Sequence, residues 1–125
     1  MTPTPEDRQP PFSESAERSV LGSVLLDDRK VLDICQDYNL APEAFYVPSH
    51  RLIYEAMLRL QQAQKPVDMM TLPDALGDKL DAVGGIVALH KLEEDTPTAA
   101  HCEHYLDIVT KKWRRRSMQK LLNWA

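Results

Sequence analysis

Apolar residues recur at helical spacing along most of this chain. Near its start, Ala16, Val20 and Val24 follow one another every four residues behind Ser13, whose side chain can cap a helix. Gly22 lies in this stretch, where glycine lowers helix stability by about 1 kcal/mol relative to alanine. Because a glycine at such a position needs a compensating gain, we expect it to allow close packing against a neighbouring helix. No segment alternates between apolar and polar residues as a strand would. The pattern predicts an all-α fold, a compact six-helix domain.

Prolines divide the middle of the chain. Pro48 and Ser49 open a helix, since proline suits the first helical turn and serine can cap it. Pro66 ends that helix, because proline has no N–H to donate and clashes with the preceding turn. Thr71, with Asp74 three residues later, has the spacing of a capping box. The segment therefore predicts a helix, a tight proline turn and a new helix.

Two further helices are expected at about 86–94 and from about 99 onward, with Pro97 between them. Because their connection is short, we expect them to form an antiparallel hairpin. The apolar positions of the last helix keep one register up to Trp113 and then shift, to Met118, Leu121, Leu122 and Ala125. One straight helix would not keep both sets on one face. We expect a second packing environment to begin there, or the chain to have been cut inside a longer protein.

These boundaries suggest three parts. Residues 1–12 hold four of the nine prolines and almost nothing apolar, so they are expected to be a disordered leader. Residues 13–95 would form the helical globular body together with the first hairpin helix. Residues 96–125 would form the long second hairpin helix, leading into a linker.

The composition is typical of a soluble globular protein, with 43% hydrophobic and 27% charged residues. No apolar run approaches the length of a membrane span, and no signal-peptide pattern opens the chain. Cys35 and Cys102 lie in predicted helices without metal-site spacing, which favours buried free thiols in a reducing compartment. We therefore expect a cytoplasmic protein that does not engage a membrane.

Charge is unevenly distributed along the chain, whose formal net charge is −4. Residues 1–109 carry nine Lys and Arg against 19 Asp and Glu, whereas residues 110–125 carry six Lys and Arg and no acidic residue. The acidic part would repel phosphates. The basic part could bind nucleic acid with Trp113 as a stacking group. Trp113 also continues the apolar stripe of the last helix, however, which favours a protein interface.

Three short motifs could carry chemistry, and none has the partners that it needs. The His-Cys-Glu-His run at 101–104 offers two histidines on one side of a helix, whereas zinc sites need three or four ligands. His50 is expected to bond the backbone or a nearby carboxylate rather than act in catalysis. Gly84-Gly85 lacks the spacing of a P-loop and predicts a turn. We expect no catalytic, cofactor-binding or metal-binding residues in this chain.

Many of these residues also occur together in one protein family. They are Pro11, Ala16-Glu17, Ser19-Val20-Leu21-Gly22, Phe45-Tyr46, His50-Arg51, Ile53-Tyr54, Ala56-Met57, Leu60, Pro66-Val67-Asp68, Thr71-Leu72, Leu76, Val83-Gly84-Gly85, Leu89, Leu92, Pro97, Tyr105 and Ile108-Val109. Each motif alone is weak, but in this order and spacing they are specific. From Pro11 to about Trp113, the chain resembles the N-terminal domain of DnaB-type replicative DNA helicases.

The resemblance implies a domain whose terminal hairpin pairs between subunits, giving dimers that assemble as three pairs in a hexamer. The implied subunit interface is the hairpin stripe, formed by Leu89, Leu92, Tyr105, Ile108, Val109 and Trp113. A DnaG-type primase would dock on the collar of N-terminal domains. A RecA-like ATPase that uses ATP and Mg would follow after a linker, and none of its motifs occurs here. DNA would be bound by the parent ring rather than by this domain.

Two alternatives remain open. The helicase-binding domain at the end of a DnaG-type primase has a similar helical fold, although the proline-rich leader favours a true N-terminus. A small nucleic-acid-binding protein could use the basic residues of 110–125.

Overall fold

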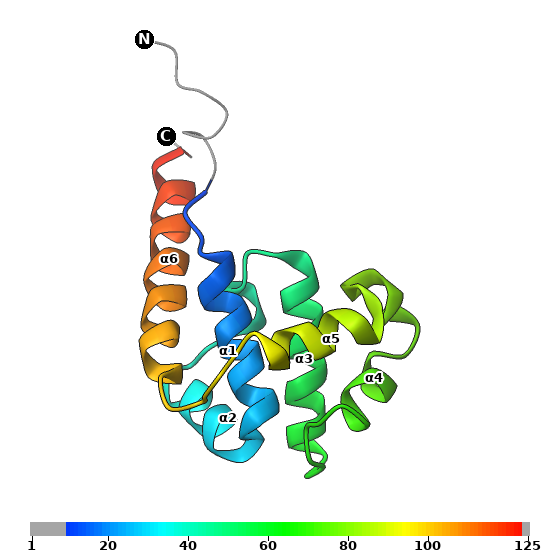
Figure 1. Cartoon of the computed structure of the whole chain (residues 1–125). Coiled ribbons are helices and arrows are strands. Elements are labelled where there is room, and N and C mark those ends of the chain that lie inside the picture. Colours follow the sequence, from blue (N-terminus) through cyan, green and yellow to red (C-terminus); the bar gives the residue numbers. More distant parts are fainter. Residues whose placement is uncertain (1–9, 124–125) are drawn as a thin grey trace.

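The computed structural model describes residues 10–123, and within that range the regular structure is entirely helical (Figure 1). The α-helices are α1 (Glu14–Leu26), α2 (Asp28–Asp37), α3 (Pro48–Gln62), α4 (Thr71–Leu76), α5 (Gly85–Glu94) and α6 (Cys102–Asn123). Single turns of 3-10 helix are η2 (Pro42–Ala44), η3 (Gly77–Lys79) and η4 (Asp81–Val83). The predicted all-α fold with six helices is confirmed for this part of the chain. None of these helices is long and apolar enough to cross a membrane.

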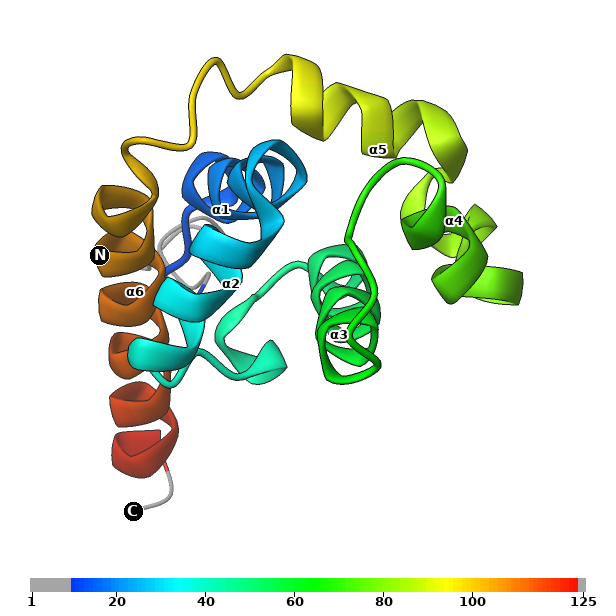
Figure 2. The same cartoon turned by 90° about the horizontal axis from the view of Figure 1, so that it is seen from below.

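Helix α1 is the centre of the packing. It contacts α2, α3, α5 and α6, and Figure 2 shows it between α6 on one side and α5 on another. Val20, Leu21 and Val24 on this helix are completely buried. Residues from every α-helix complete a single core around them, including Leu32, Tyr54, Met57, Leu72, Leu89 and Leu106.

Helices α5 and α6 do not form the predicted antiparallel hairpin. Both pack on α1, and they run in different directions on separate sides of it (Figures 1 and 2). A short connection requires only that the two helix ends lie near each other, and α1 offers each helix an apolar surface of its own. The boundaries were predicted better than the packing, since α5 ends at Glu94 and α6 begins at Cys102.

The close approach predicted at Gly22 is confirmed, and its neighbour is the end of α5. A Cβ atom at Gly22 would lie 1.9 Å from Thr96 Oγ1 and 2.5 Å from the carbonyl oxygen of Leu92. The Thr96 hydroxyl itself donates to that carbonyl at 2.9 Å. Only a residue without a side chain lets α5 come this close to α1.

Capping differs from the prediction at two helices. Thr71 and Asp74 do not form a capping box; instead the Asp68 carboxylate accepts the backbone N–H groups of Met70 and Thr71, at 2.8 and 2.9 Å. Thr71 Oγ1 in return accepts the N–H of Asp68 at 3.0 Å. At α3, Pro48 takes the first turn as predicted, but Ser49 does not cap the helix, which follows Val47 without a local side-chain cap.

Part of the predicted leader packs on the body. Phe12 stacks on Tyr46 with ring centroids 4.4 Å apart, and the carbonyl oxygen of Pro11 accepts a hydrogen bond from Arg116 at 3.0 Å. Residues 10–12 are therefore held against the body, contrary to the prediction for them. Residues 1–9 lie outside the described part of the chain.

Candidate functional site

The last turns of α6 project beyond the other helices (Figure 1). The first half of this helix packs on α1 and buries Cys102, Leu106 and Val109. From Ser117 to Leu122 every side chain is exposed. One continuous helix thus has an inner half inside the core and an outer half that the described part of the chain leaves uncovered.

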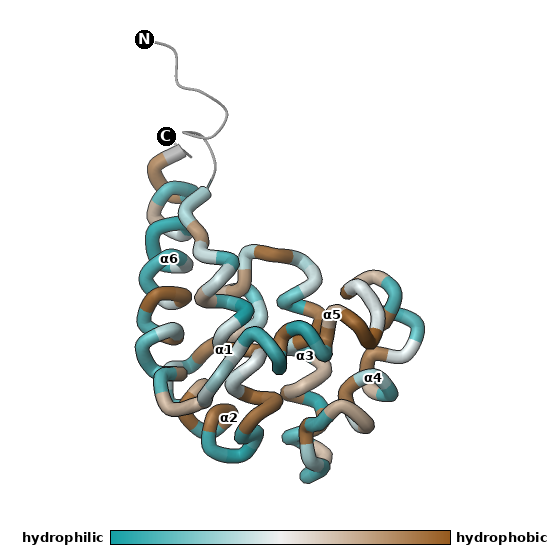
Figure 3. Tube along the Cα trace, viewed as in Figure 1, coloured by the Kyte–Doolittle hydropathy of each residue, from teal (hydrophilic) through white to brown (hydrophobic). Residues whose placement is uncertain are grey.

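The outer half carries an apolar stripe, made of Met118, Leu121 and Leu122, which we call the outer stripe. These side chains are 59%, 71% and 72% exposed, and Figure 3 shows hydrophobic residues near this end of α6. Spacings of three and four residues put them on one side of the helix. At about 100° per residue, Met118 lies about half a turn around the helix from Val109, which faces the core. The register shift predicted beyond Trp113 therefore turns apolar side chains away from the body.

The six residues predicted as a subunit interface do not share one surface. Leu89, Leu92 and Val109 are buried in the chain's own core, with at most 3% of each exposed. The other three, Tyr105, Ile108 and Trp113, are half-buried along α6 and pack against that core. A second subunit cannot reach the first three in this fold. These stripes are apolar, as predicted. The residues Leu89, Leu92 and Val109, however, lie in the core that α5 and α6 form with α1, and not on a surface that a partner subunit could cover.

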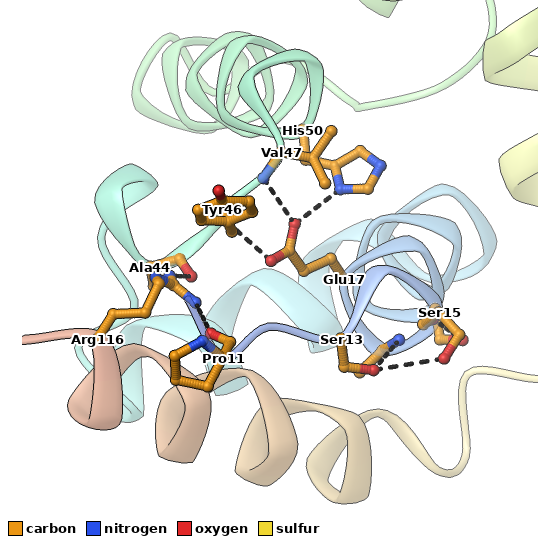
Figure 4. A network of polar contacts seen from close by, with 11 residues as sticks. Pro11, Ser13, Ser15, Glu17, Ala44, Tyr46, Val47, His50 and Arg116 are labelled. Atoms are coloured by element: carbon orange, nitrogen blue, oxygen red, sulfur yellow. Dashed lines mark hydrogen bonds and ion pairs between the residues drawn. The ribbon is translucent and has the colours of Figure 1, made fainter. Parts of the chain in front are cut away.

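Arg116 holds the outer half of α6 to the body (Figure 4). Its guanidinium donates to the carbonyl oxygens of Ala44 at 2.6 Å and Pro11 at 3.0 Å. It also lies over the ring of Tyr46, 5.4 Å from the centroid. Burial lowers the pKa of this guanidinium, while the charge of Glu17 raises it. These contacts fix the direction in which the outer stripe leaves the body.

A second cluster, around Glu17 of α1, fixes the start of α3 (Figure 4). The Glu17 carboxylate accepts the backbone N–H groups of Tyr46 at 2.8 Å and Val47 at 3.3 Å. Its Oε1 atom also lies 2.8 Å from Nδ1 of His50. The structural interpretation of His50 is confirmed, since its partner is a buried carboxylate. Glu17 does what Ser49 was predicted to do, from a helix that sequence spacing could not have connected with α3.

The remaining candidate motifs are spread apart. His101 and His104 are exposed whereas Cys102 is buried, and within residues 10–123 no three metal-ligating side chains gather. Gly84 and Gly85 have φ values of 102° and 75° and lie in the predicted turn, where α5 begins. Burial raises the pKa of Cys35 to about 12, which keeps this thiol protonated and unreactive at neutral pH. The outer half of α6 remains the best candidate for a functional surface.

Comparisons with known proteins give the family. Residues 9–111 match the family described as the DnaB-like helicase N terminal domain. The replicative DNA helicase DnaB of Geobacillus stearothermophilus is 39% identical over 108 residues, covering 85% of this chain and 23% of that protein. The replicative DNA helicase DnaC of Bacillus subtilis is 40% identical over 114 residues, covering 90% of this chain and 25% of that protein. The chain thus spans about a quarter of these relatives' length.

Solved structures agree in fold. The crystal structure of the N-terminal domain of DnaB helicase from Mycobacterium tuberculosis matches with a TM-score of 0.82 and 36% identity, covering 90% of this chain and 80% of that one. A DnaB-like replicative helicase, studied together with its interactions with primase, matches with a TM-score of 0.79 and 25% identity, covering 90% of this chain and 26% of that one. By sequence and by fold, this chain belongs to the DnaB-like helicase N-terminal domain family.

Proposed function

We propose that this domain assembles the subunits of a hexameric replicative DNA helicase and offers a docking surface to a DnaG-type primase. The observation that carries the proposal is the outer stripe, which lies on a helix projecting from the body. In the parent protein a RecA-like ATPase, using ATP and Mg, would unwind DNA at the replication fork. This domain would contribute contacts between subunits and no chemistry.

Assembly follows from the exposed area of the outer stripe. Full burial of a leucine or methionine side chain contributes roughly 1.5–3 kcal/mol. Three such side chains on one side of a helix would contribute favourably to association when a second copy covers them, against the entropy that association costs. The half-buried Tyr105, Ile108 and Trp113 would lie along the same helix at the edge of this contact. We propose a pair of subunits as the basic unit and three pairs in the ring.

Charge supports the same arrangement. Residues 110–125 are basic and residues 1–109 are acidic in balance, so the outer half of α6 is attracted to the body of a neighbouring copy. This attraction would orient the subunits, while the apolar stripe would supply most of the affinity.

Primase docking rests on the relative whose structure was studied together with its interactions with primase. Its fold is shared along 90% of this chain, which supports the proposal that a primase docks on a corresponding surface here. The family assignment also favours a helicase domain over the primase-domain alternative. The nucleic-acid-binding alternative makes a separate prediction, which is treated in the Discussion.

The experiment is to replace Leu121 and Leu122 together with aspartate and to measure association by sedimentation velocity. We expect the double variant to stay folded and to sediment as a monomer at concentrations where the unaltered domain associates. The matched control replaces Met70 and Val87, which are 86% and 78% exposed, with aspartate in the same way. Association that survives in the α6 variant, or is lost equally in the control, would contradict the proposal.

A further inference from the structure

A groove lies between the start of the chain's described part, the segment before α3 and the outer half of α6. Its volume is about 410 Å³. The residues that matter for its chemistry are Glu43, Tyr46, Arg51, Trp113, Arg116 and Lys120. Because it combines residues from three separate segments, the groove exists only in the folded domain. The assembly proposal places Trp113 at the edge of a subunit contact and uses the basic charge of residues 110–125, but it gives the groove itself no ligand.

The groove is cationic in an acidic molecule. Arg51, Arg116 and Lys120 line it against a single carboxylate, that of Glu43. Among the described residues, no carboxylate lies within ion-pair distance of any of the three cations. Burial lowers the pKa of Arg116, the charge of Glu17 raises it, and the nearby positive charge of Arg51 has a smaller lowering effect. These like charges repel each other, and an anion bound between them would relieve that repulsion.

The aromatic lining favours a peptide over a nucleic-acid strand. Tyr46 is already covered by Phe12, which stacks on it, and by the guanidinium of Arg116. Stacking on aromatic rings gives single strands much of their affinity for proteins. Because both Phe12 and Arg116 lie on the ring of Tyr46, a nucleobase could not stack on it. Trp113 is half-buried and offers an apolar wall. A strand of phosphates would also run onto the acidic body, whereas a short acidic segment engages the groove alone.

We propose that this groove binds an acidic segment of a partner protein, with carboxylates on Arg51 and Lys120 and an apolar side chain against Trp113. Arg116 already donates hydrogen bonds to two backbone carbonyl oxygens, so it would attract the carboxylates by its charge without binding them directly. Lys120 and Met118 are two residues apart, or about 200° around the helix. Lys120 and Met118 therefore lie on different sides of α6, so the charge of Lys120 can be removed without altering the outer stripe, whereas Trp113 borders both the groove and the stripe.

The test is a fluorescence-anisotropy titration of the full 125-residue chain with a labelled peptide of alternating aspartate and leucine. Arg51→Gln combined with Lys120→Gln removes two of the groove's three cations. The matched control, Lys111→Gln with Arg115→Gln, removes the same charge from exposed positions outside the groove. We expect the groove variant to bind at least about tenfold more weakly and the control to stay within about twofold. A peptide with serine in place of leucine should also bind more weakly.

Three outcomes would overturn the proposal. The labelled peptide does not bind the unaltered chain, or both double variants weaken binding equally, which would indicate unspecific attraction. The third is that a twelve-nucleotide thymidine strand binds more tightly than the peptide and loses affinity in the groove variant, which would make the groove a nucleic-acid site. Circular dichroism of each variant checks that the fold is intact.

Discussion

Glu17 and His50 lie 33 positions apart in the sequence and meet in the core, with Oε1 and Nδ1 2.8 Å apart. Only 1% of Glu17 and 4% of His50 is exposed. The same carboxylate accepts two backbone N–H groups of the segment that leads into α3. The Glu17 side chain of α1 thus fixes the start of α3. The ring of Tyr46, whose N–H group Glu17 accepts, is covered by Arg116 of α6.

Replacing Glu17 with alanine should destabilise the domain strongly. Three donors would lose their acceptor in or near the core, and unsatisfied buried donors cost about 1–3 kcal/mol each in the worst case. We expect the free energy of unfolding in urea to fall by about 3 kcal/mol. Glu14→Ala is the control, since Glu14 is exposed on the same helix and should change stability by less than about 0.5 kcal/mol. Similar losses in both variants would show that the buried network contributes little.

Gly22→Ala should be destabilising, although alanine is the better helix former by about 1 kcal/mol. The added methyl group would overlap both Thr96 Oγ1 and the carbonyl oxygen of Leu92, and a backbone carbonyl cannot swing away. We expect a loss of about 2 kcal/mol in thermal or urea unfolding.

Adding Thr96→Ala to Gly22→Ala tests the cause. It removes the contact with Thr96 Oγ1 and leaves those with the Leu92 carbonyl oxygen and with the Cβ atom of residue 96, so it should recover only part of the loss. A single Gly22→Ala variant that is more stable than the unaltered domain would mean that α5 can move away from α1 without cost.

The turn between α3 and α4 should loosen in acid. Hydrogen bonds from the N–H groups of Thr71 and Met70 hold the pKa of Asp68 below its ordinary value of 3.8. A group with a lowered folded-state pKa stabilises the fold above its unfolded pKa, and this contribution is lost as pH falls through the folded pKa. We expect the amide protons of Met70 and Thr71 to lose protection from exchange only as the pH falls below 3.8, where the Asp68 carboxylate takes up a proton. Asp68→Asn should abolish this pH dependence, while Asp74→Asn should retain it.

Single-stranded DNA should bind this domain only weakly at physiological salt. Acidic residues outnumber basic ones by 19 to nine in residues 1–109, and they oppose a polyanion along most of the surface. Changing Lys111, Lys112, Arg114 and Arg115 to glutamine should therefore alter DNA affinity little. Tight binding with a steep salt dependence that these substitutions remove would instead support the nucleic-acid-binding alternative.

The sequence alone was sufficient for the helices and for the family. Pro48, Pro66 and Gly84 mark boundaries through their own backbone preferences, which act over one or two residues and need no tertiary contact. The register shift beyond Trp113 was visible as a change in spacing, and its apolar residues Met118, Leu121 and Leu122 are exposed in the structure; the second packing environment that it predicts stays a prediction.

Only the tertiary structure decided which apolar stripes meet. Leu89 and Val109 looked available to a second subunit until α1 was found to cover them, because the pattern shows that a side chain is apolar but does not show what buries it. Glu17 could not be connected with the start of α3, nor Arg51 with Lys120, since each pair is brought together by packing between distant segments. Local preferences therefore determined the helices, and long-range burial determined the core, the outer stripe and the groove.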